Sequence, residues 1–324
     1  MSETKHIPRV SCVIPTHNRF EKLSRLVESI LKSSYAPDHI ELIIIDDASE
    51  GSILQKIVER YGQNPTIKIL HNETNQMVAK TRNIGLRHAK ADYIFFVDDD
   101  VIVAPDAIGK LVDFMGKNSD FGIAGPLICA HDDPEKIWAA GVRLNLWAVY
   151  STFIFKGKDR REIEGDVILC DGMPTAFMAR RSVVKKQGGF NYRYFPIAYE
   201  ELDFCYRSRL LGYQVGVVPS SIVWHDLPRG DKFGTPESLY YGAKNSIIAF
   251  QLWSQNPFQS FTSKMITPVL YSSYFLLKIF FNRKKFIAAG KAVIRGCWDG
   301  FSAARGVIPY RVMKRRGKSL AFRE

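Results

Sequence analysis

An apolar run at residues 93–97 (YIFFV) leads directly into three consecutive aspartates, Asp98, Asp99 and Asp100. A short run of this kind predicts a strand that is buried on both faces. Three carboxylates at one strand end repel one another and are costly to desolvate, so we expect a cation beside them. Oxygen ligands suit Mg²⁺ or Mn²⁺, although a solvated acidic turn would explain the same residues.

The first half of the chain alternates apolar segments of strand length with segments whose apolar residues recur at helical spacing. The predicted strands are residues 10–15, 41–46, 67–70 and 93–97, and the predicted helices are 19–33, 53–61 and 78–88. This alternation predicts an α/β fold with a mostly parallel central sheet and helices on both faces. Ligands bind such sheets beyond the carboxyl ends of the strands, which places the aspartates at a binding edge.

The second half has fewer regular signals. We predict strands at 121–126, 170–180 and 214–218, the last ending at Pro219, and a helix at 201–211. The chain contains no GxGxxG or GxxxxGK[ST] segment. A sugar nucleotidyltransferase normally opens with a glycine-rich phosphate loop, so this absence disfavours that class of enzyme.

Five segments follow one another in the order found in the inverting glycosyltransferases of family 2, which have the GT-A fold. They are residues 11–19 (SCVIPTHNR), 44–49 (IIDDAS), 79–85 (AKTRNIG), 97–100 (VDDD) and 188–207. The chain resembles this family from about residue 10 to about residue 256. The last segment resembles the block of rhamnosyl- and galactofuranosyl-type members, with two departures: Glu200-Glu201 replaces a Glu-Asp pair, and Asn191 replaces an aspartate.

The resemblance implies a site for a nucleotide-diphosphate sugar. Asp47 would accept a hydrogen bond from the nucleobase, and Asp98 would contact the ribose or a metal ion. The residues implied to line the nucleotide pocket are Pro15, Thr16, Asn18 and Arg19. Arg82 would face the pocket or its supporting carboxylates. The alternatives are helix capping for Asp46 and Asp47 and a surface position for Arg82.

The resemblance also implies Mn²⁺ or Mg²⁺ as the cofactor. Asp100 is the expected metal ligand, with the ion bridging both phosphates of the donor and offsetting charge on the departing diphosphate. His225 matches a histidine that completes the coordination in related members, and a neutral imidazole is a reasonable ligand for Mn²⁺. A structural histidine is the alternative.

The acceptor hydroxyl needs a base as it attacks. Glu201 aligns with the base of the family, and Glu200 is the second candidate. Acidic residues in the first turn of a helix are also favoured by the helix dipole, which would explain one or two of them without catalysis. We assign weaker acceptor- or phosphate-binding expectations to Asp203 and Lys244, of which Lys244 has a helix surface position as an equal alternative.

The charge of the chain is concentrated near its end. Residues 264–324 contain 14 Lys and Arg against two acidic residues, and so hold the whole formal net charge of +12. The apolar run 265–281 is shorter than the roughly 20 residues of a membrane span and is followed by Arg283-Lys284-Lys285. We therefore divide the chain into a GT-A domain, 1–256, and a basic amphipathic helical region, 257–324, that lies in the membrane interface. A soluble helix packed on the core is the alternative, and nucleic acid is disfavoured because no reader motif is present.

The expected function is metal-dependent inverting transfer of a hexosyl or deoxyhexosyl unit from a nucleotide-diphosphate sugar to a glycan or polyprenyl- or lipid-linked acceptor, in cell-surface polysaccharide or glycolipid synthesis. The polar residues 1–9 lack the apolar stretch of a signal peptide, so we expect a cytoplasmic protein bound to the anionic inner face of the membrane. A non-catalytic member that binds nucleotide sugar or glycan within an assembly is the alternative.

Overall fold

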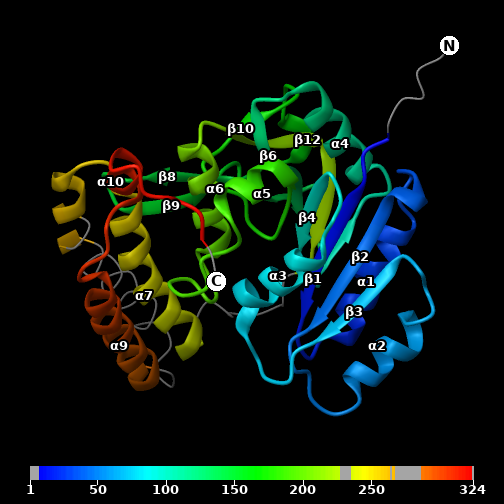
Figure 1. Cartoon of the computed structure of the whole chain (residues 1–324), viewed down its shortest axis with the longest axis horizontal. Coiled ribbons are helices and arrows are strands. Elements are labelled where there is room, and N and C mark those ends of the chain that lie inside the picture. Colours follow the sequence, from blue (N-terminus) through cyan, green and yellow to red (C-terminus); the bar gives the residue numbers. More distant parts are fainter. Residues whose placement is uncertain (1–6, 227–234, 263–264, 267–285, 323–324) are drawn as a thin grey trace.

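The computed structural model describes residues 7–226, 235–262, 265–266 and 286–322. Its main sheet has ten strands in the order β10-β12-β6-β11-β4-β1-β2-β3, with β5 beside β12 and β7 beside β6 (Figure 1). The strands are β1 Val10–Thr16, β2 Ile40–Asp46, β3 Ile67–His71, β4 Tyr93–Val97, β5 Val101–Val103, β6 Phe121–Ala130, β7 Ile137–Ala139, β10 Ile168–Leu169, β11 Ala176–Arg180 and β12 Gln214–His225. A separate hairpin consists of β8 Val142–Asn145 and β9 Tyr150–Phe153.

Helices flank the sheet and continue beyond it. They are α1 Phe20–Leu31, α2 Ile53–Tyr61, α3 Met77–His88, α4 Ala107–Lys117, α5 Arg181–Gln187, α6 Glu200–Leu210, α7 Pro236–Trp253, α9 Phe286–Ala304 and α10 Tyr310–Arg315, with 3₁₀ turns at Pro37–His39 and Arg160–Glu162. In the part of the chain that is described, no helix is both long and apolar enough to cross a membrane.

The sheet is parallel in the first half of the chain, where predicted strands and helices alternate most regularly. Strands β3, β2, β1 and β4 run parallel, whereas β11 is antiparallel to both of its neighbours, β4 and β6. Strand β12 then runs parallel to β6 and continues to His225 across a register shift between Val218 and Ile222. The predicted strand end at Pro219 is therefore wrong, because the shift lets the strand continue past the proline.

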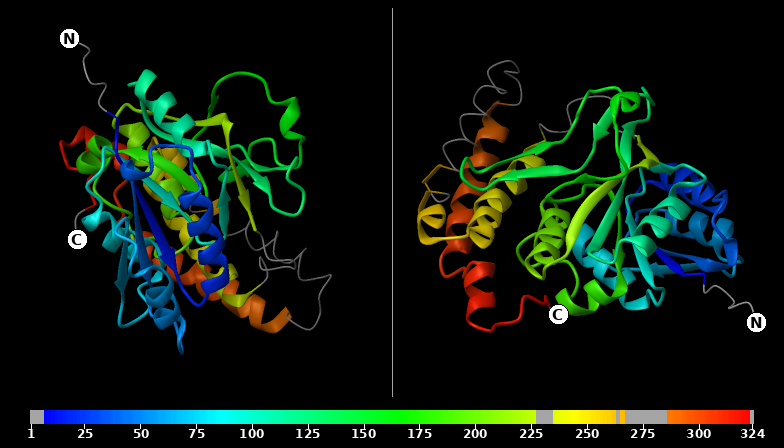
Figure 2. Two further views of the ribbon diagram at one scale, coloured as in Figure 1. Left: turned by 90° about the vertical axis from the view of Figure 1, so that its right-hand side faces the viewer. Right: turned by 90° about the horizontal axis from the view of Figure 1, so that it is seen from above.

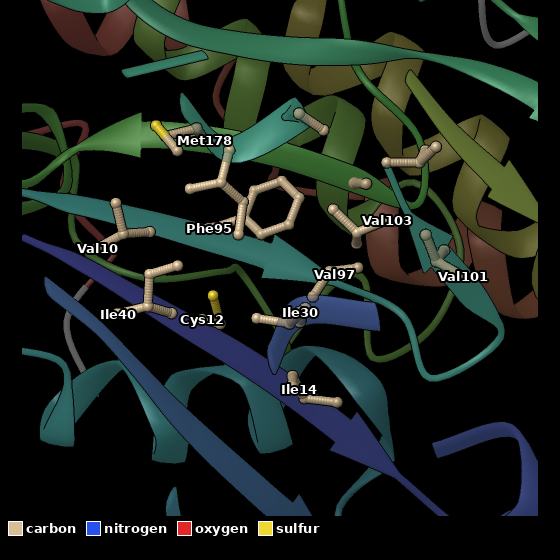
Figure 3. Packing of buried hydrophobic residues seen from close by; sticks show 14 of the residues in the cluster. Val10, Cys12, Ile14, Ile30, Ile40, Phe95, Val97, Val101, Val103 and Met178 are labelled. Carbon is tan, nitrogen blue, oxygen red and sulfur yellow. The ribbon is translucent and has the colours of Figure 1, made fainter. Parts of the chain in front are cut away.

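The two faces of the sheet bury alternate residues of the same strands. Cys12 and Ile14 of β1 pack with Phe95 of β4 on the face covered by α1, α2 and α4, as Figure 3 shows for part of this cluster. Val13 of β1 and Phe96 of β4 face α3 and α6 on the opposite side. This alternation, with period two, is why both faces of the predicted strands are apolar.

The C-terminal helices pack against the rest of the chain. Helix α9 lies along α7, with Ala289 and Val293 against Leu239 and Ala243 (Figure 2). Beyond α10, the backbone N–H of Phe322 donates to the carbonyl of Gln187 over 2.9 Å. The predicted boundary at residue 256 thus separates segments that touch one another. Residues 267–285, which hold most of the predicted interfacial segment, lie outside the described residues.

Candidate active site

The carboxyl ends of β1 and β4 meet at one edge of the sheet and bring Thr16 to the aspartates. Thr16 Oγ1 donates to Asp99 Oδ2 over 2.8 Å, and Arg19 Nη1 donates to Asp99 Oδ1 over 3.0 Å and to Asp100 Oδ2 over 3.2 Å. Burial raises the pKa of Asp99 to about 6, against the opposing effect of Arg19. Of the residues expected to line the nucleotide pocket, Thr16 and Arg19 therefore contact the aspartate cluster.

Asp47 follows the end of β2 and is almost fully buried. Its Oδ1 accepts hydrogen bonds from Asn72 Nδ2 over 2.7 Å and from the backbone N–H of Gln76 over 2.8 Å. Asn18 has a positive φ of 57° and lies beside the loop after Asp47, where its Oδ1 accepts from the backbone N–H of Glu50 over 2.7 Å. Pro15 is buried within β1. Two hydrogen bonds thus fix the Asp47 carboxylate at the same sheet edge as the aspartates, and Asn18 is bonded to the loop that follows it.

Arg82, on α3, is buried among three carboxylates. Its Nη1 donates to Glu200 Oε1 over 2.9 Å, and its Nη2 donates to Glu201 Oε1 over 2.8 Å and to Asp98 Oδ1. The side chain is only 1% exposed, and its guanidinium lies over the ring of Phe190. The surface alternative for Arg82 is wrong: the arginine is a buried cation that joins β4 to α6.

Glu201 is held by backbone as well as by Arg82. The N–H of Thr175 lies 3.0 Å from both Oε1 and Oε2 of Glu201. Burial, together with the charges of Asp98 and Glu200, raises the pKa of Glu201 to about 8 despite Arg82. Glu201 is 16% exposed and Glu200 is 6% exposed, so Glu201 is the more accessible of the two.

The backbone around these glutamates is strained. Thr175, Ala198 and Tyr199 all have positive φ, at 66°, 61° and 70°, which costs energy in residues other than glycine. Asn245 on α7 donates from Nδ2 to the carbonyls of Ile197 and Ala198, over 2.7 and 3.0 Å, and so supports this loop. The fold thus maintains an unfavourable conformation where α6 begins.

Asp100 and His225 come together because β5 pairs with β12, with Val101 opposite His225. His225 Nε2 lies 3.2 Å from Asp100 Oδ1. Burial alone would raise the pKa of Asp100, but His225, Arg19 and Lys22 outweigh it and lower the pKa. A carboxylate oxygen and an imidazole nitrogen are both donors that Mn²⁺ accepts, so the chemistry of this pair fits a divalent metal ion. No group of three metal-binding side chains occurs in the described residues.

Asp203 and Lys244 lie apart from Arg82. Asp203 is fully buried; its Oδ2 accepts from Arg207 Nε over 2.8 Å, and its Oδ1 accepts from Tyr310 over 2.9 Å. This position leaves the Asp203 carboxylate without access to a ligand, so it serves packing. Lys244 lies over the rings of Tyr240 and Tyr241 on α7.

The sequence reasoning missed three residues that organise the site. Thr175 donates to Glu201 through its backbone N–H, and no sequence pattern predicts such a contact. Asn72 holds Asp47 from the end of β3. Lys22 lies 3.8 Å from Asp100 and follows Arg19 by three residues, so the helical spacing of the two cations was the available signal.

Comparisons with known proteins show which family this chain matches. The model of the family described as "Glycosyl transferase family 2" matches residues 11–188, which is more than half of the chain. An uncharacterised glycosyltransferase of Haemophilus influenzae is 36% identical over 113 residues, which cover 35% of this chain and 44% of the relative. The poly(ribitol-phosphate) beta-N-acetylglucosaminyltransferase TarP of Staphylococcus aureus is 35% identical over 119 residues, which cover 36% of each chain.

The solved structure of mannosyltransferase PcManGT from Pyrobaculum calidifontis, in complex with GDP-Man and Mn²⁺, matches with a TM-score of 0.56 at 15% identity. The match covers 97% of this chain and 80% of that one, and the shared fold is the GT-A fold. The chain spans less than half the length of the two sequence relatives. The matched profile and the shared fold together show that this chain belongs to glycosyl transferase family 2.

Proposed function

We propose that this protein is an inverting glycosyltransferase that moves a hexosyl or deoxyhexosyl unit from a nucleotide-diphosphate sugar to an acceptor hydroxyl. The finer assignment is the rhamnosyl- and galactofuranosyl-type subgroup, which the segment 188–207 resembles. The observation that carries the proposal is the cluster of Asp98, Glu200 and Glu201 around Arg82 at the carboxyl edge of the sheet. Family membership and the GT-A fold support it.

Glu201 is the proposed general base. It removes the proton of the acceptor hydroxyl as that oxygen bonds to the anomeric carbon, while the bond from this carbon to the diphosphate oxygen breaks. This single displacement inverts the anomeric centre. The N–H of Thr175 and the guanidinium of Arg82 fix the carboxylate, and a raised pKa makes it a stronger base once it is ionised.

We assign the remaining site residues either to the nucleoside end or to the diphosphate end of the donor. Asp47, Asn18, Pro15 and Thr16 lie at the proposed nucleoside end. Asp98 is 28% exposed and is available to the ribose. Arg19 is 44% exposed and contacts the aspartates, so we place it at the diphosphate end, where its charge offsets that of the phosphates.

Asp100 and His225 are the residues that would hold Mn²⁺ or Mg²⁺. A divalent ion bound there offsets the charge that develops on the departing diphosphate. The presence of Mn²⁺ in the structure of PcManGT with GDP-Man supports this assignment. Lys22 and Arg19 flank Asp100 from α1 and supply positive charge from the protein itself.

We also propose that residues 1–256 are the transferase domain, and that region 257–324 binds an anionic membrane surface and brings the site to a glycan or lipid-linked acceptor. On α9, Ile294 and Trp298 are 72% and 70% exposed, and Phe301 continues the same face. The exposed cations Lys291, Arg295 and Arg305 lie beside them. An apolar stripe interspersed with cations is the composition of an interfacial helix. Co-sedimentation with phosphatidylglycerol vesicles tests this, with phosphatidylcholine vesicles as the control.

Donor binding tests the transferase proposal. Thermal shifts are measured with UDP-, GDP- and dTDP-linked sugars, in Mn²⁺ or EDTA, on the wild type and on Asp100→Ala. We expect a metal-dependent shift with one nucleotide class that the variant loses. No shift with any donor would contradict the proposal, whereas donor binding without release of nucleotide diphosphate would indicate a non-catalytic binding member.

A further inference from the structure

A pocket lies between the β8–β9 hairpin and the C-terminal half of α6, away from the glutamates at the N-terminus of that helix. Figure 2 shows where the hairpin runs. We call this site the hairpin pocket: it is an open pocket lined by the hairpin, by the C-terminal half of α6, and by Gln255 and Gln259. Its volume is about 370 Å³, within the range of small-molecule sites. It shares no residue with the donor site proposed above.

Two aromatic side chains at the hairpin end are exposed where burial would be favourable. Trp147 is 59% exposed and Tyr150 is 48% exposed, and both line the hairpin pocket. Large aromatic rings with a polar atom are characteristic of surfaces that bind a partially apolar, partially polar ligand. The C–H faces of a sugar ring and its hydroxyl groups have this mixed character.

The polar groups of the pocket are fixed in place before a ligand arrives. Asp171 pairs with Arg209 Nη1, and its Oδ2 accepts from the backbone N–H of Leu144 over 2.8 Å. Arg143 Nη2 donates to the carbonyl of Leu169 over 3.0 Å. Because one carboxylate offsets one of two guanidinium groups, the pocket carries about one net positive charge. Gln259, which is almost fully buried, adds an amide. This donor set suits a hydroxyl-rich ligand with few negative charges.

The pocket lies within reach of the proposed base. Tyr206 and Arg209 follow Glu201 by five and eight residues on α6, which is about 8 and 12 Å along the helix axis. Asp171 precedes Thr175 by four residues, which at full extension is at most about 14 Å. A ligand portion bound there is too distant to react and close enough to belong to the same extended molecule.

We propose that the hairpin pocket binds a glycan segment of the acceptor, remote from the hydroxyl that reacts, with sugar rings against Trp147 and Tyr150. This inference rests on the proposed function for the identity of the molecule, although the pocket itself is independent of donor chemistry. It gives the enzyme a preference for acceptors that are already several sugars long, because a monosaccharide cannot fill both sites.

Calorimetric binding to the full chain tests the inference. The probes are cellohexaose, maltohexaose and chitohexaose, each compared with its monosaccharide. We expect one or more hexasaccharides to bind, and the double variant Trp147→Ala/Tyr150→Ala to weaken that binding about tenfold or more. The matched control is Phe261→Ala, which removes an equally exposed aromatic residue outside the pocket lining.

Two further measurements separate this inference from the transferase proposal. Hydrolysis of the donor by water should be unchanged in the Trp147→Ala/Tyr150→Ala variant, and hexasaccharide binding should persist in Glu201→Gln. If no hexasaccharide binds at millimolar concentration, or the double variant binds as the wild type does, the inference is wrong even where donors bind. If hexasaccharides bind and no donor does, the inference about the hairpin pocket is supported and the transferase proposal is wrong.

Discussion

Helix α6 carries two buried arginine–carboxylate clusters that differ in their charge balance. In the first, Arg207 donates to Asp203, to the carbonyl of Gln187 and to the carbonyl of Gly189, each over 2.8 Å. One cation meets one carboxylate, and the second oxygen of that carboxylate accepts from Tyr310 and Trp253. Every charged atom of this pair has a partner, which is the condition for a buried ion pair to be tolerated.

The second cluster, one turn earlier, is unbalanced. Arg82 faces three carboxylates, and Arg82 Nε and Glu200 Oε2 are buried without a hydrogen-bond partner among the described residues. Buried negative charge that the protein leaves uncompensated raises the pKa values of the carboxyl groups involved. It also favours a ligand that is positively charged or donates a proton. Both clusters are buried, so burial of charge does not distinguish them, whereas the excess of negative charge does, and it is the reason we propose the second cluster as the site.

Glu201→Gln should give the largest effect, because it removes the base from the unbalanced cluster. We expect the rate of transfer to fall by about 10² to 10⁴, the usual contribution of a general base. The free energy of unfolding should not fall, since one of three repelling carboxylates has been neutralised. Steady-state kinetics and urea unfolding check both statements. Glu200→Gln is the matched control, and a larger loss of rate there would reassign the base to Glu200.

Asp203→Ala, in the balanced cluster, should lower stability, in contrast to Glu201→Gln. It leaves the guanidinium of Arg207 buried without a counter-ion, and we expect a loss of about 3–5 kcal/mol in the free energy of unfolding. Urea denaturation measures this. Replacing both residues, as Asp203→Leu with Arg207→Met, should recover part of the loss, because it removes the uncompensated charge but leaves the other hydrogen-bond partners of the pair unpaired. A double variant that is as unstable as the single one would argue against the charge explanation.

The pH dependence of kcat/KM should report the raised pKa of Glu201. The base acts when deprotonated, so activity should increase about tenfold per pH unit below a pKa of about 8 and level off above it. A plateau that extends down to pH 5 would show that the carboxylate is ionised throughout. The residual activity of Glu201→Gln should lack this dependence.

Asn191→Asp should give the smallest effect and tests why an aspartate is absent there. Asn191 Nδ2 lies 3.2 Å from the hydroxyl of Tyr310, which itself donates to Asp203. A carboxylate at 191 would compete with Asp203 for one hydroxyl proton, and we expect a loss of about 1–3 kcal/mol in unfolding free energy. Asn191→Ala removes the same hydrogen bond without adding charge. Equal losses in the two variants would exclude like-charge repulsion as the reason.

Most of the sheet could be predicted from the sequence because its strands are apolar on both faces. The carboxyl ends of β1, β2 and β4 were placed at one edge by the parallel arrangement alone, and Asp47, Asp98 and Asp100 are found there. The pairing of Asp100 with His225 could not be derived in this way. It depends on the register shift that carries β12 past Pro219, and tertiary contacts set such a shift.

Sequence patterns were also insufficient for side chains whose partners are distant. The resemblance placed Arg19 in the nucleotide pocket but did not indicate its partners, and its guanidinium reaches the aspartates after β4. The β8–β9 hairpin lies in an aromatic stretch without clear periodicity, because its residues pack against α6 and α7 instead of the sheet. In both cases the deciding contact joins residues far apart in sequence.

The docking of Phe322 beside Gly188 has a consequence for the order in which the protein matures during synthesis. A Cβ at Gly188 would lie 1.9 Å from the carbonyl oxygen of Phe322, so the two backbones are in direct contact. Translation at 5–20 residues per second takes about 6–24 s to go from Glu201 to Phe322. During that interval the nascent chain has its aspartates and glutamates but not the segment that packs behind α6. The contact between Phe322 and Gly188 therefore forms only after the rest of the α6 environment has been synthesised.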